Sequence, residues 1–250
     1  MNSFELVQWL DTLLNIQAIS DDSLNGLQVA NSGKLSKVAL AVDVSETAIR
    51  HAGELHADFL IVHHGLFWGK CEPLVGPLYK RIRLLLDYDM ALYAVHLPLD
   101  LHPELGNNMG LLRELGWESS FDVGEFHGKP IGKAVVLSSP VSLDSIVEKW
   151  KTQFREEPLV WRFGPELISR IAVVSGGALT LLDQIVKGHF DLFITGEPKH
   201  SGYWFAQEAG INVIFGGHYA TETFGVKMLG QAIQTQWKIE TVFLDHPTGY

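Results

Sequence analysis

Three stretches of the chain consist of consecutive apolar residues with no alternating polar face: 38–42, 59–62 and 90–95. Such runs are typical of strands buried on both faces, as in a parallel sheet covered by helices. Between the runs, at about 46–56 and 81–88, apolar residues recur at helical spacing. Strands that alternate with helices in this order predict an α/β fold with a parallel sheet.

Capping and turn residues complete the first half of the pattern. We predict a helix over 2–16 that is capped by Asn2 or Ser3, followed by a polar turn and a short extended piece over 21–29. A second helix is capped by Ser45. A later helix is capped by Asn107 or Asn108 and ends at Leu115, before Gly116. Pro98 and Pro103 predict a shaped loop after residue 95, because proline disfavours both regular helix and central strand.

The second half repeats this order at an offset of 133 positions, the separation of Val38 and Ile171. Identical pairs at this offset are Ala39/Ala172, His56/His189, Asp58/Asp191 and Ile61/Ile194. A third apolar run follows in each half, at 90–95 and 211–215, and each leads through a turn with histidine into a helix. We therefore predict an α/β fold of two interlinked lobes of similar topology, produced by internal duplication, each a sheet with helices on both faces.

The predicted lobes are residues 1–124 and 125–250. A polar, glycine-rich stretch at 117–135 is the predicted link between them, and residues 140–144 lead into a predicted helix through about 154.

Composition narrows the class of protein. Of the 250 residues, 46% are hydrophobic and 19% are charged, as in ordinary globular proteins. The net charge of −10, without a cluster of lysine and arginine, argues against nucleic-acid binding. No apolar run approaches the ~20 residues of a membrane span, and the N-terminus does not resemble a signal peptide. The single cysteine, Cys71, excludes an internal disulfide and a cysteine metal cage, so we expect a reducing cytoplasm.

Two adjacent histidines, His63 and His64, end the apolar run at 59–62. In open α/β sheets, ligands bind at the carboxyl ends of strands. Neighbouring side chains on a regular strand point to opposite faces, so the pair would not chelate one ion from within the strand. At the strand end, each imidazole can serve a different ion of a two-metal site. The alternative is that both histidines are structural residues at a sheet edge. Whether the pair binds metal therefore depends on whether other parts of the chain supply further ligands.

Such partners follow two other predicted strands. His218 and Glu222 come after strand 211–215, and a spacing of four places both on one face of a helix, although such pairs are also common on solvated faces. Asp100 follows strand 90–95, where a turn or cap residue is the alternative. Three histidines and two carboxylates without a thiolate suit two divalent ions of Zn, Mn, Fe, Co or Ni. Glu222 is our choice for a carboxylate that bridges both ions.

Two more residues are candidates for catalysis. His96 follows strand 90–95, where it acts as an acid or base, orients a metal ligand, or holds the Pro98 loop as a structural residue. Glu197 corresponds to His64 in the repeat and so can face the same site. Asp43, at the end of strand 38–42, is expected to cap the next helix, and His200 has no assigned role.

Seven segments, taken together and in order, resemble one known family: Asn25-Gly-Leu-Gln-Val29, His63-His-Gly-Leu-Phe-Trp-Gly69, His96-Leu-Pro-Leu-Asp100, Gly106-Asn-Asn108, Ile194-Thr-Gly-Glu197, Gly217-His218 with Glu222, and Phe243-Leu-Asp-His-Pro247. The chain resembles the YbgI-type family of NIF-like dinuclear metal-centre proteins, the GTP cyclohydrolase type 2 homologues. It lacks the central domain that longer members insert. The resemblance implies a two-metal site between the lobes and a toroidal hexamer, with His63, His64, Asp100, His218 and Glu222 as the metal ligands.

The leading hypothesis for the function is a cytoplasmic hydrolase in which two divalent ions activate water. A GTP cyclohydrolase-like reaction on a small-molecule substrate, with nucleotides as candidates, is implied by the resemblance alone, because the sequence has neither a P-loop nor a Gly-x-Gly-x-x-Gly turn. The alternative is a non-catalytic hexameric scaffold that binds metal for metal handling or partner recognition. The third hypothesis is a ring-shaped oligomer that encircles a nucleic-acid strand, and the net negative charge of the chain argues against it.

Overall fold

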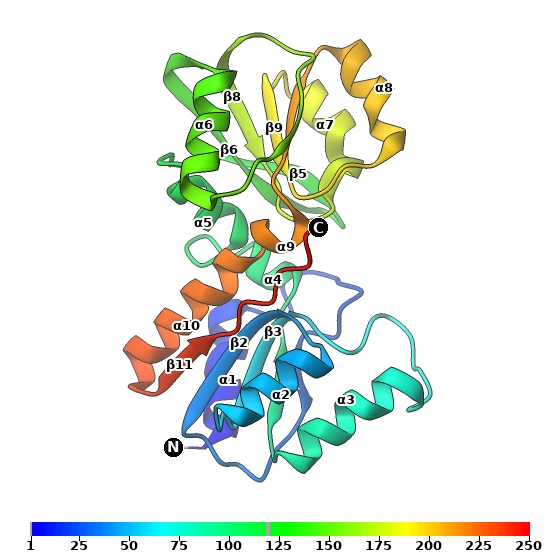
Figure 1. Cartoon of the computed structure of the whole chain (residues 1–250), viewed down its shortest axis with the longest axis vertical. Coiled ribbons are helices and arrows are strands. Elements are labelled where there is room, and N and C mark those ends of the chain that lie inside the picture. Colours follow the sequence, from blue (N-terminus) through cyan, green and yellow to red (C-terminus); the bar gives the residue numbers. More distant parts are fainter. Residues whose placement is uncertain (1, 119–120) are drawn as a thin grey trace. The chain divides into compact units, whose positions relative to one another are not determined.

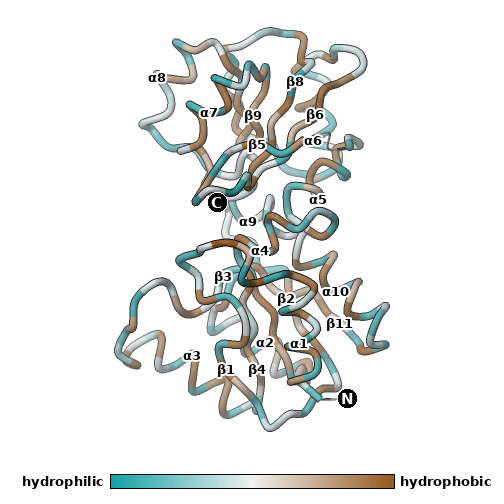
Figure 2. The backbone as a smooth tube through the Cα atoms, turned by 180° about the vertical axis from the view of Figure 1, so that it is seen from behind, coloured by the Kyte–Doolittle hydropathy of each residue, from teal (hydrophilic) through white to brown (hydrophobic). Residues whose placement is uncertain are grey.

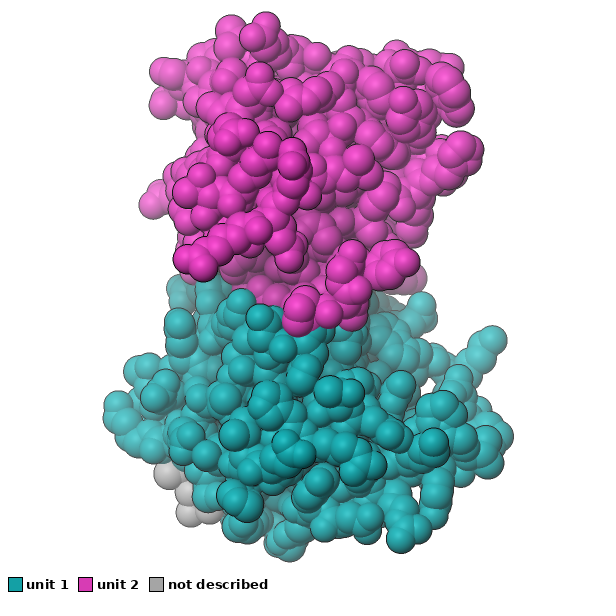
Figure 3. Space-filling view, viewed as in Figure 1, with its two compact units in different colours: residues 1–105, 225–246 teal, residues 106–224, 247–250 magenta. Residues whose placement is uncertain are grey.

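A computed structural model of the chain describes residues 2–118 and 121–250. The chain forms two compact units, drawn in different colours in Figure 3: unit 1 holds residues 1–105 and 225–246, and unit 2 holds residues 106–224 and 247–250. The chain therefore leaves unit 1, builds unit 2 and returns. These units are groups of contacting residues and do not by themselves define folding domains, so the boundary at 124/125 stays a prediction.

Unit 1 is a five-stranded sheet with the strand order β1-β4-β3-β2-β11 (Figure 1). Its elements are α1 Ser3–Leu14, β1 Gly26–Val29, β2 Lys37–Asp43, α2 Glu46–Glu54, β3 Phe59–His64, α3 Gly76–Asp87, β4 Ala91–Ala94, α4 Leu97–Asp100, α10 Thr223–Trp237 and β11 Glu240–Phe243. Neighbouring strands pair in parallel from β4 to β11, and only β1 pairs antiparallel, with β4. The buried parallel strands predicted from the apolar runs are therefore present.

Helices cover both faces of this sheet. Ala39 and Ala41 of β2 belong to a core cluster with buried residues of α2 and α3. On the other face, Leu40 meets α10 at Gly230, where an added Cβ would lie 2.9 Å from a Leu40 methyl. Because side chains alternate along a strand, one apolar run can fill both helix layers. The uninterrupted hydrophobicity of 38–42 follows from this arrangement.

The predicted caps of the first two helices are confirmed. The Asn2 side chain accepts from the Glu5 N–H, while the Glu5 carboxylate accepts from the Asn2 N–H, and together they form a capping box. The Ser45 hydroxyl accepts from the Ala48 N–H at the start of α2. Both side chains satisfy donors that the first helical turn leaves without a backbone partner.

Three local expectations were wrong. Residues 97–100 form the short helix α4 despite Pro98, because proline in a first turn lacks only an N–H that has no helical partner there. Helix α5 is capped by Gly106 and not by Asn107 or Asn108, which are both fully buried. Helix α3 begins at Gly76, five residues before the predicted start, with a proline in its first turn.

Unit 2 is a six-stranded sheet with the strand order β5-β6-β8-β9-β10-β7. Its elements are α5 Asn107–Glu114, β5 Phe121–Phe126, β6 Lys129–Ser142, α6 Leu143–Phe154, β7 Leu159–Trp161, β8 Leu167–Val173, the 3-10 helix η1 Ala178–Leu181, α7 Leu182–Lys187, β9 Leu192–Thr195, α8 His200–Ala209, β10 Asn212–Phe215 and α9 His218–Thr221. Strands β8, β9 and β10 run parallel. They correspond in order to β2, β3 and β4, as the predicted duplication requires.

Both faces of the second sheet are also buried. Phe193 of β9 packs in a cluster with residues of α7 and α8, whereas its neighbours Leu192 and Ile194 pack with residues of α5 and α6. Hydrophobic residues accordingly follow the strands of each unit in Figure 2. The two-layer burial is the reason that neither β3 nor β9 shows an alternating pattern.

The predicted link at 117–135 is wrong for the residues that the structure describes there. Strands β5 and β6 form an antiparallel hairpin in which Phe126 pairs with Lys129. The two residues of its turn, His127 and Gly128, both have positive φ, at 50° and 76°. This conformation suits a two-residue hairpin turn. The glycine and polar content thus marks a hairpin and not a linker. No helix among the described residues has the length and hydrophobicity to cross a membrane.

Candidate metal centre

Three histidines gather at one edge of the sheet in unit 1. His63 and His64 are the last two residues of β3, and His96 precedes α4. The ring centroids of His63 lie 4.7 Å from His64 and 5.0 Å from His96. One ring nitrogen from each of the three lies within 4.8 Å of the others. The structure thus adds His96 to the predicted pair.

His63 is fully buried and held by a backbone carbonyl. Its Nδ1 lies 2.9 Å from the Val95 oxygen, which can only accept, so Nδ1 donates its proton there. In the neutral ring, Nε2 then carries the lone pair. Nε2 lies 3.5 Å from Oδ2 of Asp100, a buried residue at the end of α4. The short helix α4 therefore brings the predicted carboxylate to His63.

His64 is held by a carboxylate on the neighbouring strand. Its Nδ1 lies 2.8 Å from Oδ1 of Asp43, which is its register partner in the parallel pair of β2 and β3. The expectation that Asp43 caps a helix was wrong, because Ser45 does so. The signal was present in the sequence, since Asp43 ends the strand before β3 and parallel strands end at the same sheet edge.

His96 is held by residues of the turn before β1. Its Nδ1 lies 3.0 and 3.1 Å from the two oxygens of Asp21, and its backbone N–H donates to Oδ1 of Asn25. Burial raises the pKa of Asp21, but hydrogen bonds and charge from His96, with further donors from Asn25 and Ser23, outweigh it and hold the pKa at about 2. No pattern in the sequence singled out Asp21, because this pairing spans 75 residues.

In all three imidazoles, the Nδ1 N–H donates to an oxygen acceptor. The Nε2 atom of each neutral ring then carries the lone pair that can bind a metal ion. Histidines that ligate metals almost always donate their second ring N–H to a carboxylate or a backbone carbonyl, which fixes the tautomer and the ring orientation. The residues of unit 1 therefore have the chemistry that a divalent ion with nitrogen and oxygen ligands requires.

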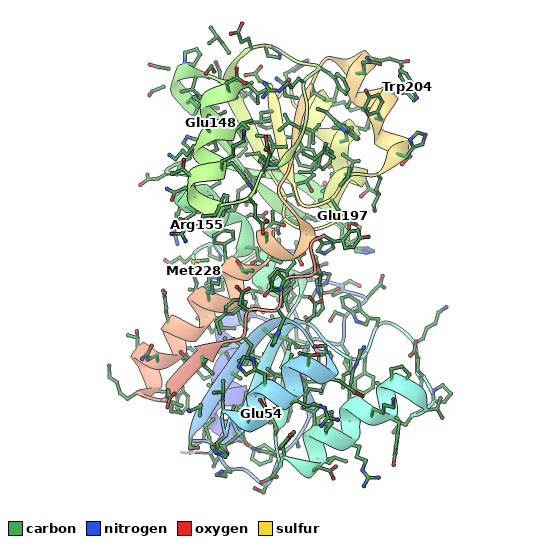
Figure 4. All side chains as sticks on the ribbon, in the orientation of Figure 1. Glu54, Glu148, Arg155, Glu197, Trp204 and Met228 are labelled. Atoms are coloured by element: carbon green, nitrogen blue, oxygen red, sulfur yellow. The ribbon has the colours of Figure 1, made fainter. Side chains whose placement is uncertain are left out.

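Unit 2 holds a second group, built around His218. This residue begins α9, and its Nε2 lies 3.2 Å from Oε2 of Glu222, which follows the same helix. Its Nδ1 lies 3.3 Å from Oε2 of Glu197, which is labelled in Figure 4. Burial lowers the pKa of His218, but the hydrogen bonds and charges of Glu222 and Glu197 outweigh it and raise the pKa to about 9.

Glycine backbones enclose this second group. At Gly176, where φ is +65°, an added Cβ would lie 2.1 Å from Oε1 of Glu222. At Gly177 it would lie 2.9 Å from Oε1 of Glu197, and at Gly196 it would lie 2.8 Å from Cα of His218. The two carboxylates can occupy their positions only because these residues have no side chain. Two carboxylates around one imidazole make a field that favours a cation, whether a proton or a metal ion.

The remaining candidate, His200, is the first residue of α8 and is exposed. The groups described above are therefore His63, His64, His96 and Asp100 in unit 1, and Glu197, His218 and Glu222 in unit 2. Sequence reasoning missed the residues that hold them in place, namely Asp21, Asp43 and Gly176.

Comparison with known proteins places the whole chain in one group of relatives. A protein of Archaeoglobus fulgidus named GTP cyclohydrolase 1 type 2 homolog is 43% identical over 248 residues, which cover 99% of each chain. A protein of Pyrococcus horikoshii with the same name is 42% identical over 250 residues, all of each chain.

Solved structures agree with these relatives. The crystal structure of a protein from Thermus thermophilus superimposes with a TM-score of 0.91 at 43% identity over the full length of both chains. Protein ybgI, described as of unknown function, superimposes with a TM-score of 0.92 at 34% identity over the full length of both chains. The sequence model of the Duf34/NIF3 (NGG1p interacting factor 3) family matches residues 1–249. The chain belongs to the Duf34/NIF3 family.

Proposed function

We propose that the protein binds two divalent metal ions through His63, His64 and Asp100 of unit 1 and His218 and Glu222 of unit 2, and that it is a metal-dependent hydrolase. The ions are of the Zn, Mn, Fe, Co or Ni type, because the ligands are imidazoles and carboxylates. In this proposal the two groups complete one dinuclear site, with Glu222 as the bridging carboxylate.

One observation carries the proposal: the Nδ1 atoms of the two adjacent histidines are anchored by oxygen acceptors, Val95 for His63 and Asp43 for His64. Structural histidines need not bring their ring nitrogens together, whereas metal ligands must, and one ring nitrogen from each of His63, His64 and His96 lies within 4.8 Å of the others. The carboxylates around His218 give independent support, since they supply the negative charge that offsets two cations.

Divalent ions held by these residues would make water a stronger nucleophile at neutral pH and polarise the bond that it attacks. The side chains of the chain itself have separable tasks. Asp43 fixes the tautomer of His64, and Glu197, 3.3 Å from His218 Nδ1, is placed to do the same for His218. His96, whose Nδ1 donates to Asp21, keeps Nε2 as the atom that takes a proton from a reacting group.

The substrate in this proposal is a small molecule. The name GTP cyclohydrolase 1 type 2 homolog, carried by the relatives, makes a purine nucleotide the first candidate. In this proposal the protein assembles into a homo-oligomer, and the family resemblance implies a toroidal hexamer. The protein acts in the cytoplasm. The second candidate is a non-catalytic metal-binding scaffold. The anchored imidazoles favour it as well, since the same arrangement can store an ion without catalysing a reaction.

Metal analysis of the freshly purified protein, followed by a hydrolase screen with the metal found, tests the proposal. We expect about two ions per chain and turnover of at least one purine compound. His127→Gln is the control variant for a histidine outside the site. His127 is exposed in the β5–β6 turn, so its replacement should leave the metal content at the wild-type value. Two bound ions without any turnover would favour the scaffold, and the absence of bound metal would exclude both functions.

A further inference from the structure

A tryptophan ring lies against the histidine group of unit 1, next to His96. Trp68 follows β3 and is 40% exposed, so part of its indole is accessible. Its ring centroid lies 5.0 Å from His96 in an edge-to-face arrangement and 5.9 Å from His64. The His96 side chain is also partly accessible, at 21%. An accessible tryptophan beside candidate metal ligands is placed to contact whatever those ligands act on.

The indole is fixed in place. Its Nε1 donates to the Gly65 carbonyl at 3.0 Å, and Trp68 forms an isolated bridge with Ser23. The Leu66 N–H donates to Oε1 of Gln28, and the Leu24 N–H donates to the Phe67 carbonyl. The loop from Gly65 to Trp68 is therefore held by hydrogen bonds at four residues.

The same short segment fixes both rings. Residues 21–28 provide Asp21 and Asn25 for His96, and Ser23, Leu24 and Gln28 for the Trp68 loop. An added Cβ at Gly65 would lie 2.4 Å from the Gln28 amide, so the loop packs directly on this segment. The Asn25-Gly-Leu-Gln-Val29 motif has no ligand role in the proposed site. Its contacts give it another task, which is to position Trp68 and His96.

We propose that Trp68 and His96 form a substrate-binding wall, which takes a planar heteroaromatic ring that stacks on the indole and donates an N–H to Nε2 of His96. Asp21 acts as the positioning residue, because it holds the Nδ1 proton and keeps Nε2 an acceptor. Trp68 supplies a large rigid surface, and every aromatic heterocycle offers a face to it. This inference rests on the proposed function, since the wall borders His64.

Binding of nucleosides to the protein as purified tests the wall, with guanosine as the probe that has N–H donors and purine riboside as the probe without them. We expect Trp68→Leu to weaken guanosine binding about tenfold or more, because stacking of a base on an aromatic side chain contributes that much. Trp68→Phe, which keeps a ring, should lose less. Trp204→Leu is the matched control: Trp204 lies on α8 of unit 2 with 60% exposure, as labelled in Figure 4, and its loss should change nothing.

Asp21→Asn tests the hydrogen-bonding half of the wall. An asparagine amide can donate to Nδ1, which moves the imidazole proton to Nε2 and removes the acceptor. We expect this variant to weaken guanosine about fivefold, the share of one hydrogen bond, and to leave purine riboside unchanged. Imidazole ¹⁵N spectra should show the change of tautomer at His96. Equal losses for both nucleosides would assign Asp21 a purely structural role and overturn this half.

Metal content measured on the same samples separates this inference from the proposed function. The proposed substrate-binding wall is overturned if Trp68→Leu binds guanosine as well as Trp204→Leu does. It is also overturned if ribose competes as strongly as guanosine. Failure of guanosine, cytidine and pterin alike to bind the wild type would overturn it too. If the protein holds no metal but guanosine binding still depends on Trp68, the hydrolase proposal fails and the wall stands.

Discussion

Asp58 and Asp191 lie 133 positions apart, and each carboxylate accepts from two consecutive backbone N–H groups in its own unit. Oδ2 of Asp58 accepts from the backbone N–H groups of Ser36 and Lys37, and Oδ2 of Asp191 accepts from those of Ser169 and Arg170. Both carboxylates thus tie the start of one parallel strand to the strand that precedes it along the sheet. The duplication therefore extends from the order of elements to individual hydrogen bonds.

Replacement of either aspartate by alanine should destabilise the protein. Asp58→Ala and Asp191→Ala each leave two backbone N–H donors without their side-chain acceptor, at a cost of about 1–3 kcal/mol. We expect each variant to lower the melting temperature by several degrees, measured by calorimetry. Glu54→Ala, an exposed position at the end of α2 labelled in Figure 4, is the control and should melt like the wild type. A wild-type melting temperature for Asp58→Ala would contradict the shared role.

The contribution of Asp58 should depend on pH. Burial raises its pKa, but the Lys34 ion pair and the Ser36 hydrogen bonds outweigh it, so the pKa lies below its ordinary value. A carboxyl with a lowered folded pKa adds stability above its unfolded pKa, near ~3.9, and loses it as pH falls through the folded value. The stability difference between wild type and Asp58→Asn should thus shrink below about pH 4 in urea titrations. A difference that stayed constant down to acid pH would contradict this linkage.

His64→Ala should lose about one metal ion per chain without unfolding, because in our proposal His63 and His64 serve different ions. Elemental analysis measures the ion, and circular dichroism checks the fold. Since the side chain of His64 is partly exposed, its truncation leaves the core intact. Unchanged metal content in both His63→Ala and His64→Ala would remove the site from the end of β3.

Gly176→Ala should displace the carboxylate of Glu222 without replacing any proposed ligand. The added methyl would lie 2.1 Å from Glu222 Oε1 on a backbone with φ of +65°, so the carboxylate has to move. We expect reduced metal content with a largely retained fold. Gly128→Ala is the matched control: its φ is also positive, at 76°, but no atom lies near its added methyl. Equal metal content in both variants would show that the Gly176 contact does not position Glu222.

Glu222→Gln keeps the shape of the side chain and removes its charge. A bridging carboxylate screens the repulsion between two cations, so we expect this variant to lose metal and activity together. Its melting temperature should fall toward that of the metal-free wild type, because an ion bound only by the folded state stabilises it by about 2.7 kcal/mol at a hundredfold excess over the dissociation constant. Binding of two ions as tightly as in the wild type would exclude Glu222 as the bridge.

The sequence by itself determined the elements that depend on local pattern. Apolar runs such as 59–62, whose four residues are all fully buried, predicted strands buried on both faces, because successive residues alternately face one of two helix layers. Asn2 and Ser45 predicted helix starts, because a cap is a contact within four residues. The pairs His63 with His64 and His218 with Glu222 were visible for the same reason, since neighbours in sequence need no knowledge of the fold.

Only the tertiary structure decided which residues hold these side chains. Asp21 reaches His96 across 75 positions, Asp43 reaches His64 across 21, and Gly176 meets Glu222 from another loop. Such contacts form only once the fold has brought distant segments together, and of the three only the pairing of Asp43 with His64 was indicated in the sequence, because parallel strands end at one sheet edge. The linker predicted at 117–135 is wrong for a related reason: its polar residues resemble a loop, and only the pairing of β6 with β5 and β8 makes these strands part of a sheet. A sequence shows which side chains are capable of chemistry, and long-range hydrogen bonds decide how they are aimed.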